Sequence, residues 1–201
     1  NINYEKSFYV NKIFQIVTEN TDIRDKEKLL QKLNEFLGEN IENYSFEEKS
    51  GILKYLPVEN IRIKYRAENW ENALKEAGNI LVEGNYTNEA YTQDVIGTIK
   101  KFGMYMVLKN KFLLGHGSFS ENVKRTGFSL LMLKEPVQFP ENKKISAIVI
   151  LCSKNKEEHT FALLELNRII DKYDLFEKIK DLDRPEDIYE ELRIGKIEIN
   201  K

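Results

Sequence analysis

Two histidines, His116 and His159, are the residues of this 201-residue chain best suited to accept or transfer a charged group near neutral pH. His116 lies where an apolar run passes into a glycine- and serine-rich loop, Leu113-Leu114-Gly115-His116-Gly117-Ser118. Flanking glycines let the backbone approach a ligand closely, and the N–H of Gly117 and the hydroxyl of Ser118 are candidate donors to an anion. Taken alone, the same pattern also fits an ordinary loop histidine.

His159 precedes a stretch whose apolar residues repeat with a helical period. The spacing predicts a helix over about 156–173, with Asn155 as its N-cap and His159 on the inward face of its first turn. The apolar segment 145–152 leads into this turn, so we expect His159 at the crevice where a core strand ends. A helix N-terminus favours neighbouring negative charge and keeps an imidazole neutral. The alternative is a histidine that closes the core and donates to a carbonyl group.

Other chemistry finds little support in the sequence. Two separated histidines and one cysteine, Cys152, form no metal-ligand pattern, so we expect no metal and no other cofactor. Cys152 is expected to be a buried apolar residue, and its isolation fits a reducing cytoplasm, the expected location. The formal net charge of −2 argues against direct nucleic-acid binding by this segment. No apolar run approaches about 18 residues, which argues against membrane insertion.

The elements that must position the histidines fall into two segments. Residues 1–57 are predicted to be a helical connector, with apolar faces over 10–17 and 29–37 and a short third helix over about 45–55. Pro57 ends this third helix. Residues 58–201 are predicted to form one domain. The chain begins with asparagine rather than methionine, so we expect it to be a piece of a longer protein.

Residues 58–201 mix strand and helix patterns. Strands are expected over 61–65, 104–108, 112–114, 128–133 and 145–152, with a turn near Pro136. A helix capped by Asn69 and closed by Gly84 is expected, then one capped by Thr87 and ended by Gly103. Two helices shorter than the 156–173 helix should follow it. The pattern predicts an α/β fold: a mixed sheet of about five strands flanked by helices, with 145–152 buried in the centre.

A series of short motifs, in order from Asn69 to Leu192, contains both histidines. The motifs are Trp70-x-x-Ala73-Leu74, Gly84-Asn85-Tyr86-Thr87-x-x-x-Tyr91, Gly103-x-Tyr105-Met106-Val107, Leu114-x-His116-Gly117-Ser118, Ser129-Leu130-Leu131-Met132-Leu133, Pro136-Val137-Gln138-Phe139 and His159-x-x-x-Leu163-Leu164-x-Leu166. The series resembles the enzyme IIA domain of the fructose/mannitol class of the bacterial sugar phosphotransferase system.

The resemblance implies specific roles. In that family the histidine of a Leu-Pro-His-Gly loop takes a phosphoryl group from the carrier protein HPr and passes it to a cysteine of a IIB domain. By resemblance, His116 is the phospho-acceptor and His159 is the second histidine of the site. The donors at Gly117 and Ser118 would then bind the phosphoryl oxygens. The chain departs from the family in lacking both prolines of the loop. Lys100 also falls near the place of an arginine that holds phosphate in transport-type members.

Members of this family occur as transport components and as C-terminal domains of transcription regulators. In antiterminators of the bgl type and in mannitol-type activators, a helical segment much like residues 10–37 joins a IIB-like domain to the IIA domain. The Gly-x-Tyr-x-Val run also resembles these regulators. The resemblance therefore favours a regulatory domain with upstream domains outside this chain. A transport-type IIA component and a module that no longer accepts phosphate remain the alternatives.

Overall fold

The computed structural model describes residues 51–104, 107–109, 111–117, 121–154 and 159–200. The helices expected over 10–17 and 29–37 lie outside these residues. The described elements are, in chain order, α3 (Ile52–Tyr55), η1 (Val58–Asn60), β1 (Ile61–Tyr65), α4 (Trp70–Glu83), α5 (Glu89–Phe102), β2 (Val107–Leu108), β3 (Phe112–His116), β4 (Gly127–Gln138), η2 (Pro140–Asn142), β5 (Lys144–Cys152), α6 (Thr160–Lys172), α7 (Leu175–Ile179) and α8 (Pro185–Glu198).

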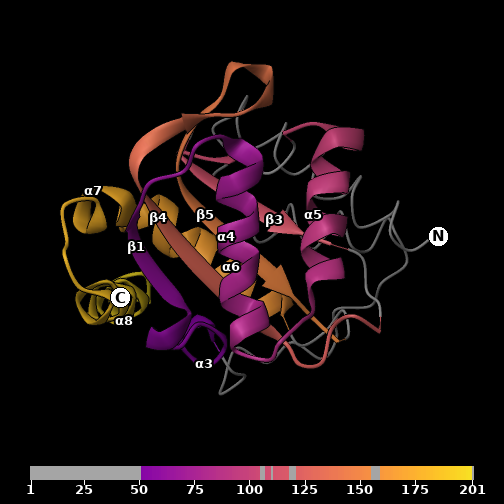
Figure 1. Ribbon diagram of the computed structural model, residues 1–201. Coiled ribbons are helices and arrows are strands. Elements are labelled where there is room, and N and C mark those ends of the chain that lie inside the picture. Colours follow the sequence, from indigo (N-terminus) through magenta and orange to yellow (C-terminus); the bar gives the residue numbers. More distant parts are fainter. Residues whose placement is uncertain (1–50, 105–106, 110, 118–120, 155–158, 201) are drawn as a thin grey trace, which may run out of the picture. The chain divides into compact units, whose positions relative to one another are not determined.

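The strands form one five-stranded sheet in the order β1-β4-β5-β3-β2 (Figure 1). β5 lies antiparallel to β4 and parallel to β3, whereas β1 runs parallel to β4 and β2 runs antiparallel to β3. The mixed sheet predicted from the sequence is thus confirmed. The most apolar segment is also the central strand, because β5 is covered on both faces and flanked on both edges.

Helices cover both faces of the sheet. Side chains of α4 and α5 pack on one face, and side chains of α3, α6, α7 and α8 pack on the other. Successive residues of β5 alternate between these two cores: Ile148 and Ile150 join the first, Val149 and Leu151 the second. In Figure 1, α4 and α5 lie in front of the sheet and α6 lies behind it.

The first long helix has the ends that the sequence predicts, and the second begins one residue later than expected. The Asn69 side chain accepts the N–H of Asn72 at 2.9 Å, and Gly84 is the C-cap of α4. At α5 the N-cap is Asn88, whose side chain accepts the N–H of Tyr91 at 3.3 Å. The expectation of a Thr87 cap was wrong because Thr87 forms an isolated extended bridge with Val123 and is buried.

The turn expected near Pro136 was also wrong. β4 continues through Pro136 to Gln138, and its pairing register with β5 shifts between Met132 and Val137. A proline fits there because an irregular, exposed stretch of strand does not need its missing N–H. The chain turns instead at η2. Two helices follow α6 as expected, α7 with 5 residues and α8 with 14, and both are shorter than the span 156–173.

The start of the described chain is held by a buried carboxylate. Glu165 of α6 is 5% exposed and accepts the backbone N–H of Ile52, the first residue of α3, at 2.6 Å. Its other oxygen lies 3.4 Å from the ammonium group of Lys196 in α8. A Cβ atom at Gly51 would overlap the carboxylate. Ile52 and Leu56 are fully buried in the core beside α6, so α3 contributes to the packing of the domain.

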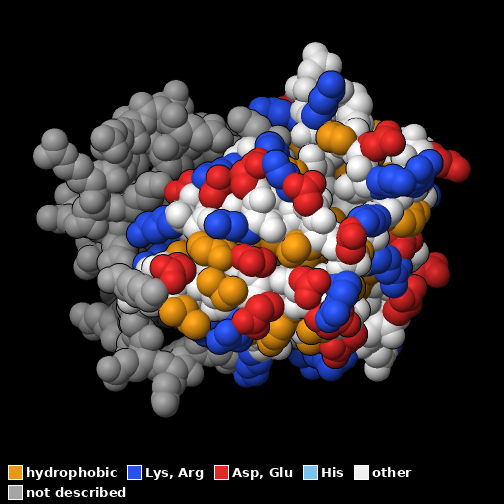
Figure 2. Space-filling model, turned by 90° about the vertical axis from the view of Figure 1, so that its left-hand side faces the viewer, with side chains coloured by type: hydrophobic (Ala, Val, Ile, Leu, Met, Phe, Trp, Pro, Cys, Tyr) orange, Lys and Arg blue, Asp and Glu red, His pale blue; other side chains and the backbone are white. Residues whose placement is uncertain are grey.

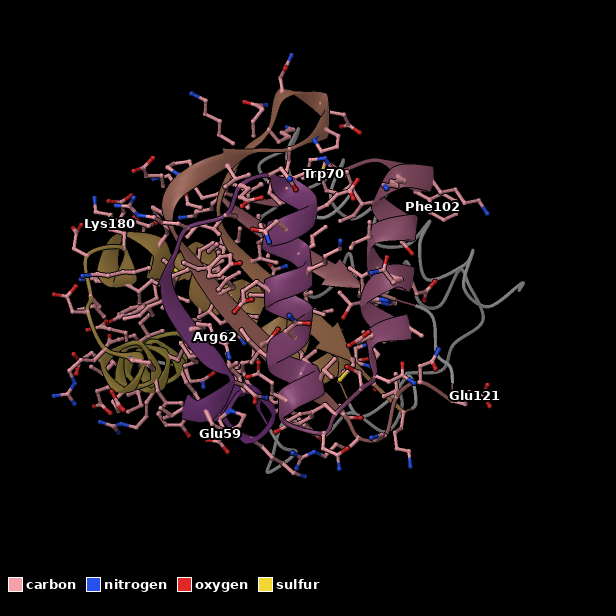
Figure 3. The ribbon with its side chains drawn as sticks, in the orientation of Figure 1. Glu59, Arg62, Trp70, Phe102, Glu121 and Lys180 are labelled. Atoms are coloured by element: carbon pink, nitrogen blue, oxygen red, sulfur yellow. The ribbon has the colours of Figure 1, made fainter. Side chains whose placement is uncertain are left out.

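The surface carries charges of both signs close together. Arg62 of β1, labelled in Figure 3, forms ion pairs with two glutamates of α4, Glu76 and Glu83. On the face shown in Figure 2, the described acidic and basic side chains are interspersed around small apolar patches. Among the described residues, none of the helices combines the length and apolarity that crossing a bilayer requires.

Candidate functional site

Successive residues at the end of β3 lie on opposite faces of the sheet, one covered by α6 and the other by α5. His116 is the last residue of β3 and pairs in parallel register with Leu151 of β5. Phe112 and Leu114 pack in the core beside α6, so the alternation of a strand places His116 on this same side. Gly115 lies on the side of α5: a Cβ atom there would stand 3.0 Å from Cγ1 of Val95.

The two histidines meet at this end of the sheet. Their ring centroids are 6.3 Å apart, and the ring planes are inclined by 83°. His159 is 8% exposed and is the N-cap residue of α6, whose backbone carbonyl accepts the N–H of Leu163 at 2.9 Å. It therefore precedes the described helix rather than lying in its first turn. The expected cap Asn155 lies outside the described residues.

Gly117 lies against α5. Its N–H donates to the hydroxyl of Tyr91 at 3.0 Å, and the same hydroxyl donates to the carbonyl oxygen of Leu151 at 2.5 Å. A Cβ atom at Gly117 would stand 2.8 Å from Oδ2 of Asp94 and 3.0 Å from the ring of Tyr91. The absence of a side chain at Gly117 thus allows the backbone to pack closely against α5. Ser118 lies outside the described residues.

Lys100 does not reach this site. It follows Tyr91 by nine positions on α5, roughly 13 Å along the helix axis. Its ammonium group pairs with Glu71 at 2.9 Å and lies 5.8 Å from the ring centre of Trp70. Figure 3 shows Trp70 at the end of α4 beside the end of α5 that carries Phe102. The expectation that Lys100 replaces a phosphate-holding arginine was therefore wrong in this structure, because the lysine serves the contact between α4 and α5.

Two residues of the site, Tyr91 and Asp94, were not singled out for chemistry in the sequence. Tyr91 lies in α5 and is 2% exposed. A buried tyrosine hydroxyl normally needs a hydrogen-bond partner, and this need was the one sign in the sequence that Tyr91 could do more than fill the core. Asp94 follows three positions later on the same helical face. No sequence pattern indicated that this face meets the loop after His116.

Burial governs the charge of the His116 imidazole. Loss of solvation lowers the pKa of His116 below its ordinary value, and hydrogen bonds to the backbone at Gly117 and at His116 itself oppose this shift. The carboxylate of Asp94 opposes it as well. The folded protein therefore holds this imidazole neutral at pH 7. A neutral imidazole has a free electron pair on one nitrogen and can act as a nucleophile.

The lowered pKa of His116 predicts that stability depends on pH. The unfolded chain binds the proton at about the ordinary pKa of 6.5, whereas the folded chain binds it only at lower pH. The unfolded state therefore holds more protons below pH 6.5, and the free energy of unfolding should fall as the pH decreases through this range. Urea unfolding between pH 7.5 and pH 5 measures the slope.

His116→Gln is the matched variant for this measurement, since it keeps His159 and Asp94 in place. Its free energy of unfolding should depend less on pH between about 6.5 and 5, the range where histidines but not typical carboxyl groups titrate. Equal slopes for the two proteins would contradict the burial of a neutral imidazole at position 116.

Cys152 is buried at the end of β5, as the sequence predicted. Burial raises the pKa of its thiol to about 12, and hydrogen bonds to the backbone at Gly127 and at Cys152 itself only partly oppose this effect. Such a thiol stays protonated and unreactive near neutral pH. Cys152 is therefore poorly suited to act as a nucleophile.

The fold is shared with solved structures of phosphotransferase IIA domains. Residues 54–194 match the family described as "Phosphoenolpyruvate-dependent sugar phosphotransferase system, EIIA 2", and the chain belongs to this family. The family resemblance stated from the motifs is thereby confirmed.

Curated relatives and solved structures agree with this assignment. The "Ascorbate-specific PTS system EIIA component" of Escherichia coli (strain K12) is 29% identical over 124 residues, which cover 62% of this chain and 79% of that protein. The crystal structure of IIA mannitol from Escherichia coli is 25% identical to this chain and has a TM-score of 0.58. The match covers 67% of this chain and 96% of that one. A complex of enzyme IIA mannitol with phosphorylated enzyme IIB mannitol from the same organism shares the fold, with a TM-score of 0.59 at 24% identity over 67% of this chain and 94% of that one.

Proposed function

We propose that this domain is a phosphohistidine carrier in which His116 accepts a phosphoryl group from HPr. The observation that carries the proposal is the 6.3 Å approach of the two imidazoles at the carboxyl ends of β3 and β5, in a chain of the EIIA 2 family. The carboxyl ends of parallel strands are where α/β sheets bind their ligands. The proposed location of the domain is the cytoplasm, because a single unpaired cysteine fits a reducing compartment.

The transfer uses the neutral imidazole. One nitrogen of His116 attacks phosphorus with its electron pair and forms the new P–N bond. The P–N bond to the phosphohistidine of HPr breaks, and its electron pair returns to the imidazole of the donor. His159 lies beside the reacting ring at the N-terminus of the 13-residue α6, where the helix dipole favours the negative charge of the phosphoryl oxygens.

Gly117 and Ser118 remain the proposed phosphate-binding residues of the loop. In the structure the N–H of Gly117 donates to Tyr91. Direct donation from Gly117 to a phosphoryl oxygen would therefore require this hydrogen bond to be exchanged. The hydroxyl of Ser118 would supply the second donor.

Within this function, we propose that the chain is the regulatory C-terminal part of a bgl-type antiterminator or a related activator. The helical connector predicted over residues 1–57, ahead of the phosphoacceptor domain predicted at 58–201, supports this placement. Its last part, α3 (Ile52–Tyr55), packs in the core of the domain instead. Upstream domains of the same protein would then respond to the charge added at His116. The ascorbate-specific EIIA components among its relatives favour the second candidate, a transport component that passes phosphate to a IIB cysteine.

Intact-mass spectrometry after incubation with phosphoenolpyruvate, enzyme I and HPr tests the carrier function. We expect one acid-labile phosphoryl group, located by peptide mapping on the fragment that contains His116. A folded protein that stays unmodified would overturn the proposal and favour an interaction module. Transfer onward to the cysteine of a separately added IIB domain would favour transport over regulation.

A further inference from the structure

The hydroxyl of Tyr91 connects the ends of two parallel strands to α5. It accepts the N–H of Gly117, directly after His116, and donates to the carbonyl of Leu151, the register partner of His116. Tyr91 is 2% exposed, so water does not readily replace either hydrogen bond. The two bonds join Tyr91 to residues 26 and 60 positions away in the sequence. Both of these residues, Gly117 and Leu151, lie next to the proposed phospho-acceptor.

The backbone at Gly117 in turn affects the imidazole. β3 ends at His116, so the strand pairing that fixes residues 112–116 stops before Gly117. Gly117 is joined to His116 by a peptide bond, so the position of this peptide unit limits the backbone conformation from which the His116 side chain projects. The orientation of the ring therefore depends on a peptide unit that Tyr91 holds.

We infer that Tyr91 is a positioning residue for phosphoryl transfer: through Gly117 and Leu151, its hydroxyl holds the His116 ring in the orientation that in-line attack on phosphorus requires. The inference rests on the proposed function of His116. Tyr91 does not touch the phosphoryl group and supplies no proton. Its contribution is geometric, since a displacement of about 1 Å in a reacting group can cost on the order of 100-fold in rate.

Tyr91→Phe tests this inference, because it removes the hydroxyl and keeps the ring that packs against Gly117. We expect the rate of phosphorylation by phospho-HPr to fall by about tenfold or more. The NMR titration of the His116 ring should also shift, because the peptide unit next to it loses its hydrogen bond to Tyr91 and the surroundings of the ring change. Tyr86→Phe is the matched control. Tyr86 belongs to the same core and is 6% exposed, yet its ring lies under the guanidinium group of Arg125 and against Gly84 and Gly127.

The two readouts separate the possible failures. A folded Tyr91→Phe protein that matches the wild type in rate and in ring titration would overturn the inference, even if its melting temperature is lower. Equal losses of rate in Tyr91→Phe and Tyr86→Phe would also overturn it, since the effect would then be one of core packing. A wild-type protein that accepts no phosphoryl group would contradict the proposed function, and the ring titration would still decide whether Tyr91 orients His116.

Discussion

Replacing His116 with alanine is expected to abolish the acid-labile phosphoryl group completely. Alanine has no electron pair that can attack phosphorus, and His159 is only 8% exposed and lies at the start of a helix. The measurement is intact-mass spectrometry after incubation with phosphoenolpyruvate, enzyme I and HPr, for a time in which the wild type is fully phosphorylated. Circular dichroism should confirm that the variant is folded.

His159→Ala is expected to behave differently at the same site. It should still take up one phosphoryl group, with a rate lower by about 100-fold, the typical effect of losing one group that stabilises transferring charge. His159→Gln, which keeps an N–H donor, should recover part of this loss. The assignment would be reversed if His116→Ala still formed phosphohistidine and His159→Ala did not.

Replacing Glu165 with alanine should cause the largest loss of stability among the changes considered. It would leave the buried N–H of Ile52 without its acceptor and remove the partner of Lys196. A buried donor left unsatisfied costs about 1–3 kcal/mol, and lost packing adds to this, so we expect a decrease of about 2–4 kcal/mol in the free energy of unfolding. Urea unfolding monitored by circular dichroism measures the difference.

Two further glutamate substitutions sharpen this prediction. Glu165→Gln keeps an oxygen that can accept from Ile52, so it should lose clearly less stability than Glu165→Ala. Glu177→Ala removes a glutamate with two lysine partners, Lys111 at 2.9 Å and Lys180 at 2.6 Å, whose side chain is 43% exposed. Solvent screens such pairs, so this change should have little effect. Equal losses at positions 165 and 177 would contradict the role given to burial.

Local patterns sufficed to predict most of the elements. The period-two alternation of 61–65 and the apolar run 145–152 became β1 and the central strand β5. The Asn69 cap and the Gly84 stop delimit α4. These features depend on residues within a few positions of one another, which is the range over which hydrophobic period and helix capping operate. The ordered motifs likewise identified the family and indicated both histidines as candidate site residues.

Local patterns gave wrong predictions where contacts with a distant segment determine the structure. Thr87 did not cap α5 because Val123 draws it into an extended bridge, and Pro136 did not end β4 because the shifted register tolerates it. Lys100 matched a family position by spacing, yet it serves the contact with Glu71 and Trp70. In each case an interaction between residues far apart in the sequence outweighed the local preference.

The sequence by itself determined the class of fold, the central strand, the family and the two histidines. Only the tertiary structure decided that His116 and Gly117 face opposite sides of the sheet and that Tyr91 joins the strand ends beside them. It also decided that Glu165 holds the start of α3, 113 positions away along the chain. The physical reason is that side-chain periodicity is encoded locally, whereas a buried hydrogen bond selects its partner only after the sheet has assembled and excluded water.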